Sequence, residues 1–587
     1  MPCRFPGLTR RARITWQGQS RSRRSSASFT SSLPFEVRRR RRIQQKSPIC
    51  NGVLPAAPQR GVAACSPVAG YCRALEQHAE RIALEIRGRD WTYGDLAGFA
   101  GAIARELVTA GSTSGLVAVF ASRSLTAFAG TLAVFAARAA HVALNPGHPP
   151  ARSASIVRQA EVTTVIVGPE ALAQLPELLD LTAIRCVIAP ESPDLTALRA
   201  MYANVRFVDA TELATPVTLR APSVEAGDLA YLVFTSGSTG VPKGVAISHG
   251  NLAVYMRNFR ALAAPLPTDR VATTYELTFD IALHDMFQTW WSGATLCVVP
   301  ARQLLAPARF ILGERITYWF SVASCAMLME RQGTLRPGIF PLLRVSMLCG
   351  EPLPATSAAV WASAAPSSLL YNVYGPTETT MELAFYRWSP ETSPGECRRG
   401  ITPIGVPFAD HEHLLLDADG REVEGVGRGE LLLAGSQVGC GYWKLPERTA
   451  QSFVSLPGRT GTWYRTGDLV ERDASGLYHF VTRLDHQVKL RGHRIELGEI
   501  EAALREVAGT SLVVVVPHPV TAGNAEGLVA FLSGGADLDT DSLRRGLAAR
   551  LPAAMVPGRI ERLAYLPLNA NQKIDRGALL ASLEGSK

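Results

Sequence analysis

The sequence predicts an α/β fold with a large N-terminal core of layered, mostly parallel sheets and covering helices, followed by a small α+β domain. Three observations support this prediction. Short apolar segments alternate with helical segments from about residue 66 onward, which is typical of parallel sheets buried on both faces. Hydrophobic residues make up 47% of the 587 residues, enough for a large core. Near Asp485 the order of elements changes.

The first elements of the core follow from the apolar pattern. We expect a helix and then a strand over residues 74–86, and a helix that opens at Thr92 and runs toward Gly111. Short apolar segments predict strands at 116–121, 141–144, 162–167 and 184–188, with a helix at 125–138. Each predicted strand is short and uninterrupted, as expected where both faces are buried.

After Asp485 the pattern predicts a smaller unit. A helix is expected at 500–507, strands at 511–516 and 528–532, and a helix at 543–551. This is the size of a common single domain. We therefore divide the chain into a basic tail of residues 1–52, a core domain of residues 53–485 and a C-terminal domain of residues 486–587.

The basic character of the chain comes from its tail. Residues 1–50 contain twelve arginines, Lys46 and one acid, Glu36, so they carry +12, while the rest of the chain carries −3. A mildly acidic body argues against nucleic-acid binding by the folded part. The Arg- and Ser-rich tail matches an organelle transit peptide or a basic arm for nucleic acid. We favour a disordered segment without function, because no amphipathic apolar face accompanies the charges.

Other classes are excluded by composition. With 50 glycines and 38 prolines the chain is no coiled coil. No apolar segment is long enough to cross a bilayer, so we expect no membrane partner. The ten cysteines show no C-x-x-C pair and no zinc-ligand spacing. Buried thiols in a reducing compartment are the simplest interpretation, and we expect a cytoplasmic protein.

The most informative segment is an apolar strand that runs into a loop rich in glycine and hydroxyl groups. The loop residues are Thr235, Ser236, Gly237, Ser238, Thr239 and Gly240, followed by Lys243. Glycines allow backbone N–H groups to turn toward an anion, and the lysine adds a point charge for phosphate. Pro242 and Gly244 flank the lysine and exclude a Walker A loop, which needs Gly before and Ser or Thr after it.

This loop resembles the phosphate loop of the adenylate-forming (ANL) superfamily, and a second segment supports the resemblance. Residues 372–380, Asn-Val-Tyr-Gly-Pro-Thr-Glu-Thr-Thr, are similar to the second nucleotide motif of that superfamily. The resemblance implies that Tyr374 stacks on adenine, Asn372 reads the adenine amino group and Thr377 meets the α-phosphate. Glu378 would hold Mg²⁺, which takes oxygen ligands. Upstream, Gly350 and Glu351 lie in a turn like the one that supports adenine.

Three further motifs follow in the order of the superfamily. Asp468, in Tyr-Arg-Thr-Gly-Asp-Leu, would accept hydrogen bonds from the ribose hydroxyls. Arg483 would be a second ribose-side contact, and Asp485 the hinge on which the C-terminal domain is mobile. Lys573 resembles the catalytic lysine, which bridges the substrate carboxylate and the phosphate. The superfamily usually has Gly where this chain has Thr482 and Gln572.

The resemblance implies ATP and Mg²⁺ as cofactors and a reaction in two steps. A carboxylate attacks the α-phosphorus of ATP to give an acyl-adenylate, and a thiol then displaces AMP. Positioning and charge stabilisation carry such catalysis, with Lys573, Thr235 and Glu378 as the predicted catalytic residues.

The acid is expected to be an amino acid, because Asp280 lies where amino-acid-activating relatives pair an aspartate with the α-ammonium group. A structural Asp that caps a helix is the alternative for this residue. The remaining predicted pocket residues are Ile281, His284, Ser321, Met347, Cys349, Val373, Met381 and Glu382. Glu382 would meet a basic or hydroxylated side chain, or would form a buried pair with His284. The amino acid itself stays open.

The thiol partner is expected to be phosphopantetheine on a separate carrier protein, because no carrier-like attachment serine or condensation domain is visible. The chain would then be a free-standing ligase of nonribosomal peptide synthesis, active in secondary metabolism. Three alternatives stay open. One is an acyl- or aryl-CoA ligase of the same superfamily, the second is a nonenzymatic binding protein whose tail docks nucleic acid, and the third is a pseudoenzyme, on account of Thr482 and Gln572.

Overall fold

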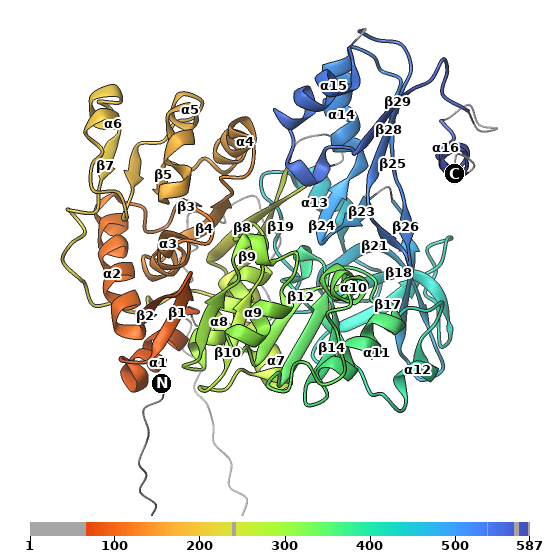
Figure 1. Ribbon diagram of the computed structural model, residues 1–587, viewed down its shortest axis with the longest axis horizontal. Helices are drawn as coiled ribbons and strands as arrows, with labels where there is room; N and C mark the ends of the chain where they lie inside the picture. The colour runs from red at the N-terminus through yellow and green to blue at the C-terminus, as the bar shows by residue number, and fades with distance from the viewer. Residues whose placement is uncertain (1–65, 238–241, 486, 537, 569–573, 585–587) are drawn as a thin grey trace, which may run out of the picture. The chain divides into compact units, whose positions relative to one another are not determined.

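Two large sheets, built mainly from parallel strands, form the body of the protein (Figure 1). The computed structural model describes residues 66–237, 242–485, 487–536, 538–568 and 574–584. The eight-stranded sheet contains, in spatial order, Gly441–Tyr442 (β19), Lys243–Ser248 (β9), Leu229–Thr235 (β8), Ala140–Leu144 (β4), Leu116–Phe120 (β3), Thr164–Val167 (β5), Cys186–Ile188 (β6) and Arg206–Val208 (β7). Strands β8 to β7 run parallel, whereas β9 and β19 are antiparallel to their neighbours.

The nine-stranded sheet follows the same plan, with a parallel centre and antiparallel ends. It contains, in spatial order, Val406–Pro407 (β16), Ala384–Arg387 (β15), Leu369–Tyr374 (β14), Val345–Cys349 (β13), Tyr318–Val322 (β12), Arg270–Thr273 (β10), Thr295–Val298 (β11), Ile82–Ile86 (β1) and Arg89–Thr92 (β2). The parallel part runs from β14 to β1.

Helices cover both faces of these sheets. The main ones are Val68–His78 (α1), Tyr93–Thr109 (α2), Leu125–Ala136 (α3), Pro150–Ala160 (α4), Leu175–Asp180 (α5), Thr196–Met201 (α6), His249–Ala263 (α7), Ile281–Trp291 (α8), Ala308–Gly313 (α9), Ala323–Arg331 (α10), Ala355–Ala364 (α11), Ser393–Glu396 (α12) and Pro446–Ser452 (α13). The largest hydrophobic cluster joins one face of each sheet through α2, α3, α7 and α8. The opposite faces pack against α4 and α5 and against α10 and α11. The predicted α/β class with layered, mostly parallel sheets is confirmed.

Local sequence accounts for where individual helices begin. Thr92 accepts a hydrogen bond from the Asp95 backbone, and Asp95 accepts one from the Thr92 backbone, which is a complete capping box at the start of α2. The predicted helix at 543–551 is instead Thr540–Ala548 (α15). It begins three residues earlier because Asp539 caps it through the Ser542 N–H group.

The remaining elements follow the second large sheet in the chain. A five-stranded sheet contains Glu412–Leu416 (β17), Gly427–Ala434 (β18), Phe453–Val454 (β20), Trp463–Arg472 (β21) and Tyr478–Arg483 (β22). Beyond it lie Gln487–Leu490 (β23), His493–Glu496 (β24), Val513–Pro517 (β25), Val520–Thr521 (β26), Asn524–Ala525 (β27), Leu528–Leu532 (β28), Arg559–Arg562 (β29), Leu497–Ala508 (α14) and Arg576–Glu584 (α16). These last elements enclose hydrophobic clusters of their own.

The predicted boundary at Asp485 falls between β22 and β23, and the domain limits themselves stay a prediction. The tail of residues 1–52 lies outside the described residues. Within the described part of the chain, no helix is both long and apolar enough to span a membrane.

Candidate functional site

Two adjoining cavities lie where the carboxyl ends of the central strands meet the segment that follows β22. The larger measures about 390 Å³ and the smaller about 190 Å³. Both are lined by Gly350, Tyr374, Asp468, Arg483 and Lys489. Four of these five residues are ones that the sequence predicts for adenine and ribose. Open α/β sheets bind ligands at this edge.

The larger cavity combines a glycine turn, an aromatic ring and oriented acceptors. Gly350 follows β13 with a φ of +76°, a conformation that favours glycine. The Tyr374 hydroxyl donates to Asp468 Oδ2 at 2.5 Å. The Asn372 amide nitrogen donates to the Pro403 carbonyl at 2.8 Å, which orients the side chain. A purine ring and a ribose diol are the chemistry that such walls accommodate.

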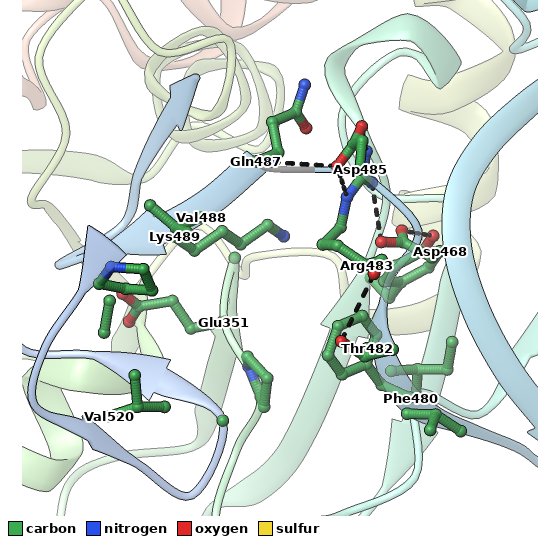
Figure 2. Close-up of a pocket in the computed structure, with 18 of the residues that line it drawn as sticks. Glu351, Asp468, Phe480, Thr482, Arg483, Asp485, Gln487, Val488, Lys489 and Val520 are labelled. Carbon is green, nitrogen blue, oxygen red and sulfur yellow. Dashed lines mark hydrogen bonds and ion pairs between the residues drawn. The ribbon is translucent and has the colours of Figure 1, made fainter. Parts of the chain in front are cut away.

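Arg483 connects the larger cavity to the segment before β23, as Figure 2 shows. Its guanidinium donates to Asp468 Oδ1 at 2.8 Å and to Asp485 Oδ2 at 2.6 Å. Asp485, the predicted hinge, also accepts from the Gln487 N–H group at 3.1 Å. Thr482 lies in β22 opposite Leu469 and does not have a positive φ. Its replacement of the usual glycine therefore costs no backbone strain.

The phosphate loop begins at the end of β8, and its described part is in contact with residues far along the chain. The Thr235 hydroxyl is buried without a hydrogen-bond partner in the described residues. Ser236 Oγ donates to the Arg494 carbonyl at 2.7 Å. The Gly237 N–H group donates to Glu499 Oε2 at 3.2 Å. A carboxylate thus contacts the amide that the loop would offer to a phosphate.

Glu378 lies at the centre of a buried charge cluster. Its carboxylate accepts from Arg494 at 2.7 Å and from the Tyr442 hydroxyl at 2.8 Å, and Lys243 Nζ lies 3.6 Å away. Burial alone would raise the pKa of Glu378, but Arg494 and Lys243 hold that pKa well below its usual range. The carboxylate is therefore ionised and paired.

This arrangement does not fit the predicted magnesium ion. Both Glu378 oxygens are engaged by protein donors, two of which carry positive charge. No group of three or more acidic, His or Cys ligands converges in the described part of the chain. Glu378 would have to separate from Arg494 before it could bind a metal, and its role as a metal ligand stays a prediction.

Further contacts hold β24 and α14 against the core, and sequence reasoning did not assign them. Glu351 accepts from the Gly492 N–H group at 2.7 Å and from the Ser324 N–H group at 2.9 Å, so its carboxylate is already occupied. Arg152 of α4 pairs with Glu499 at 2.5 Å, and both side chains are buried. Both partners of Glu499, Arg152 and Gly237, are distant from it in the chain.

The smaller cavity contains the residues predicted for the substrate. Asp280 precedes α8, makes no side-chain cap to that helix and has an Oδ2 atom without a partner among the described residues. The helix-cap alternative is therefore wrong. Ile281, Met381 and Glu382 line the same cavity, and Val373 lines the larger one.

The remaining four predicted pocket residues are buried and do not line either cavity. His284, Ser321, Met347 and Cys349 are each at most 1% exposed. His284 Nδ1 bonds to the Tyr255 hydroxyl at 2.7 Å, and its Nε2 has no partner in the described chain. The buried His284–Glu382 pair is therefore not formed. Lys573, Ser238, Thr239 and Gly240 lie outside the described residues, so their placement stays a prediction.

Comparison with known proteins agrees with this site. A family model described as AMP-binding enzyme matches residues 72–443. The L-proline--[L-prolyl-carrier protein] ligase of Streptomyces coelicolor is 33% identical over 508 residues, covering 85% of this chain and 93% of that protein. Tyrocidine synthase 3 of Brevibacillus parabrevis is 31% identical over 512 residues, which cover 86% of this chain. This chain spans only 7% of the length of that synthase, and no more than 10% of two other large synthases that it matches.

A solved structure extends the comparison to the fold. The Vibrio cholerae adenylation domain AlmE, in complex with glycyl-adenosine-5'-phosphate, superposes with a TM-score of 0.80 at 29% identity. The match covers 91% of this chain and all of that one. The chain belongs to the AMP-binding enzyme family, and the resemblance to the adenylate-forming superfamily is confirmed.

Proposed function

We propose that this protein activates an amino acid with ATP as an aminoacyl-AMP and then transfers the aminoacyl group to the phosphopantetheine thiol of a separate carrier protein. The observation that carries the proposal is the meeting of the two cavities at Gly350, Tyr374 and Asp468. One cavity has walls suited to a nucleoside, and the other contains the unpartnered Asp280 carboxylate oxygen, as far as the described residues extend. The ligase of Streptomyces coelicolor supports the choice of substrate and partner.

In the first step a carboxylate oxygen of the amino acid attacks the α-phosphorus of ATP, and pyrophosphate leaves. Asp280 would hold the α-ammonium group and so aim the carboxylate at the nucleotide. The Thr235 hydroxyl, buried without a partner among the described atoms, would donate to a phosphate oxygen. Lys573 would bridge the two reactants. Mg²⁺ would accompany ATP as its counter-ion.

In the second step the carrier thiol attacks the carbonyl carbon, AMP leaves and the thiol proton is released. The contacts of Arg494 and Glu499 with Glu378 and Gly237 support a second arrangement of the C-terminal segment. With Glu499 on the loop amide, that amide is not free for a phosphate. We infer that this arrangement serves the thiol-transfer step and that rotation about Asp485 exchanges it with the ATP-binding arrangement.

Six of the cysteines in the described residues, namely Cys72, Cys186, Cys297, Cys325, Cys349 and Cys397, are free thiols. Together with the use of ATP, this supports a reaction in the reducing cytoplasm. We propose no nucleic-acid partner, since the positive charge belongs to residues 1–50.

Amino-acid-dependent ATP–pyrophosphate exchange tests the proposal. We expect exchange with one amino acid or a few similar ones, and its loss in Asp280→Ala. A carrier protein with its phosphopantetheine arm should then become aminoacylated. Exchange with acids that lack an amino group, together with a CoA thioester product, would replace the proposal by a CoA ligase.

A further inference from the structure

Glu382 is held in the smaller cavity by an unusual stretch of backbone. The two residues before it, Thr380 and Met381, both have positive φ values, of 59° and 62°. Such values are costly for residues with a Cβ atom and persist where the surroundings impose them. Thr380 Oγ1 donates to the Gln437 carbonyl at 2.6 Å. The Met381 carbonyl lies so near Gly375 that a Cβ atom on Gly375 would be 2.0 Å from it.

The smaller cavity is lined by two buried carboxyl groups, those of Asp280 and Glu382. Asp280 and Glu382 are 6% and 3% exposed. Asp280 Oδ2 and Glu382 Oε2 both lack a hydrogen-bond partner among the described residues. Burial raises the pKa of Asp280 to about 6, and burial together with the neighbouring Asp280 raises the pKa of Glu382 to about 8. An unpaired buried carboxylate is costly unless a ligand completes it.

The protein groups around Glu382 do not supply the missing charge. Burial lowers the pKa of His284 to about 3, so that imidazole is neutral. Burial also raises the pKa of the Cys349 thiol, which stays protonated beside Glu382. Lys489 of β23 also lines the smaller cavity and lowers the pKa of Glu382, but it forms no ion pair with Glu382 in the described chain, and burial lowers its own pKa.

We propose that the substrate is an amino acid with a cationic side chain, whose α-ammonium group pairs with Asp280 and whose side-chain cation pairs with Glu382. This inference rests on the proposed function. The aminoacyl part of the adenylate has lost its carboxylate charge and carries two positive charges, which match the two carboxylates. The same cavity is lined by Phe279, Ile281 and Met381. These side chains would contact the methylene groups between the α-ammonium group and the side-chain cation of the substrate.

A neutral substrate would leave the buried Glu382 without a counter-charge in the cavity. Sites built to pair with a polar group strongly reject analogues that lack it, because the buried partner is left unsatisfied. The structure therefore predicts that the protein discriminates between basic and neutral amino acids of nearly the same size.

The test is ATP–pyrophosphate exchange by the full chain with pairs of substrates matched in size. The basic members are 2,4-diaminobutyrate, ornithine, lysine and arginine, and the neutral members are norvaline, norleucine, glutamine and citrulline. We expect kcat/KM for the best basic substrate to exceed that for its neutral match at least 100-fold. Glu382→Gln keeps the side-chain shape and should reduce the basic rate about 100-fold while the neutral rate changes little.

Control variants separate charge from folding. Glu396→Gln alters a carboxylate bonded to Tyr386, away from both cavities, and should leave every rate unchanged. Exchange with neutral amino acids at rates equal to or above those of their basic matches would overturn the inference and leave the proposed function standing. The absence of exchange with every amino acid, in a folded protein that exchanges with another acid, would remove the proposed function itself.

Discussion

Glu499→Gln is the sharpest perturbation of the arrangement in which α14 lies against the phosphate loop. The substitution keeps the shape of the side chain but removes its charge. It weakens two interactions of Glu499. One is the ion pair with Arg152 at 2.5 Å, and the other is the hydrogen bond that the Gly237 N–H group donates to Glu499 at 3.2 Å. A hydrogen bond to a charged group contributes about 1.5–3 kcal/mol, and a neutral one about 1 kcal/mol.

The expected loss follows from this difference. Because the Gln amide has a single oxygen, one charge-assisted bond becomes neutral and the other is lost. The docked arrangement therefore loses at least about 2 kcal/mol, which is at least a roughly 30-fold change in the ratio of docked to undocked protein. If this arrangement serves thiol transfer, the transfer of a preformed aminoacyl-AMP to the carrier should slow by roughly that factor in single-turnover measurements. ATP–pyrophosphate exchange, which uses the other arrangement, should be unchanged or slightly faster.

A matched control lies on the same helix. Glu506 is exposed and its distance to Arg550 is 3.6 Å, so Glu506→Gln changes the same type of residue on α14 without touching the loop. In Glu506→Gln the rates of ATP–pyrophosphate exchange and of thiol transfer should equal those of the unmodified protein. The reasoning is refuted if Glu499→Gln slows exchange and transfer equally, or if it leaves transfer untouched.

Three other predictions concern the cavities. Asp280→Asn should raise the KM for the amino acid at least 100-fold with little change in the KM for ATP, as measured by exchange, because it removes the partner of the α-ammonium group. Tyr374→Phe keeps the ring but frees Asp468 Oδ2 from its hydrogen bond, and should raise the KM for ATP about fivefold while the KM for the amino acid stays constant. Glu382→Gln should stabilise the substrate-free protein, and this gain in stability should grow as the pH rises. With a folded pKa of about 8 against an ordinary 4.5, folding retains a proton that unfolding releases between pH 5 and 8, so Glu382 lowers stability by up to about 3 kcal/mol at pH 7. Thermal unfolding of both proteins at pH 5 and pH 8 checks this, because the gain in stability of Glu382→Gln over the unmodified protein should be larger at pH 8. An equal gain at the two pH values would contradict the assignment of a raised pKa to Glu382.

The buried cluster around Glu378 differs from the sequence-based expectation for that residue. The motif predicts a metal ligand, whereas the structure pairs Glu378 with Arg494 and Lys243. The two descriptions are compatible if the C-terminal segment moves, since Arg494 follows the predicted hinge. Arg494 would then exchange places with the charges that accompany ATP, and one carboxylate would serve two arrangements of the chain.

Local patterns in the sequence are sufficient to predict the class of fold and most candidate site residues. The phosphate loop is a continuous stretch after a buried strand, so its glycines and hydroxyls indicate a phosphate site whatever packs against them. Asp280 and Asp468 likewise lie in short segments whose residue types match a defined chemistry. The apolar pattern places the start of α15 too late, because Asp539 caps the helix ahead of its first apolar residue.

Contacts between residues far apart in the chain were decided only by the tertiary structure. Glu378 and Arg494 are 116 positions apart, and Gly237 and Glu499 are 262 positions apart. No local pattern reports which buried charges find partners, because pairing depends on how separate strands and helices converge. The oxygens of Asp280 and Glu382 that lack partners among the described residues, and the Tyr255 partner of His284, became visible only once the fold had enclosed them. Burial gives those groups their energetic weight, because a charge that is harmless in water becomes costly when it is enclosed.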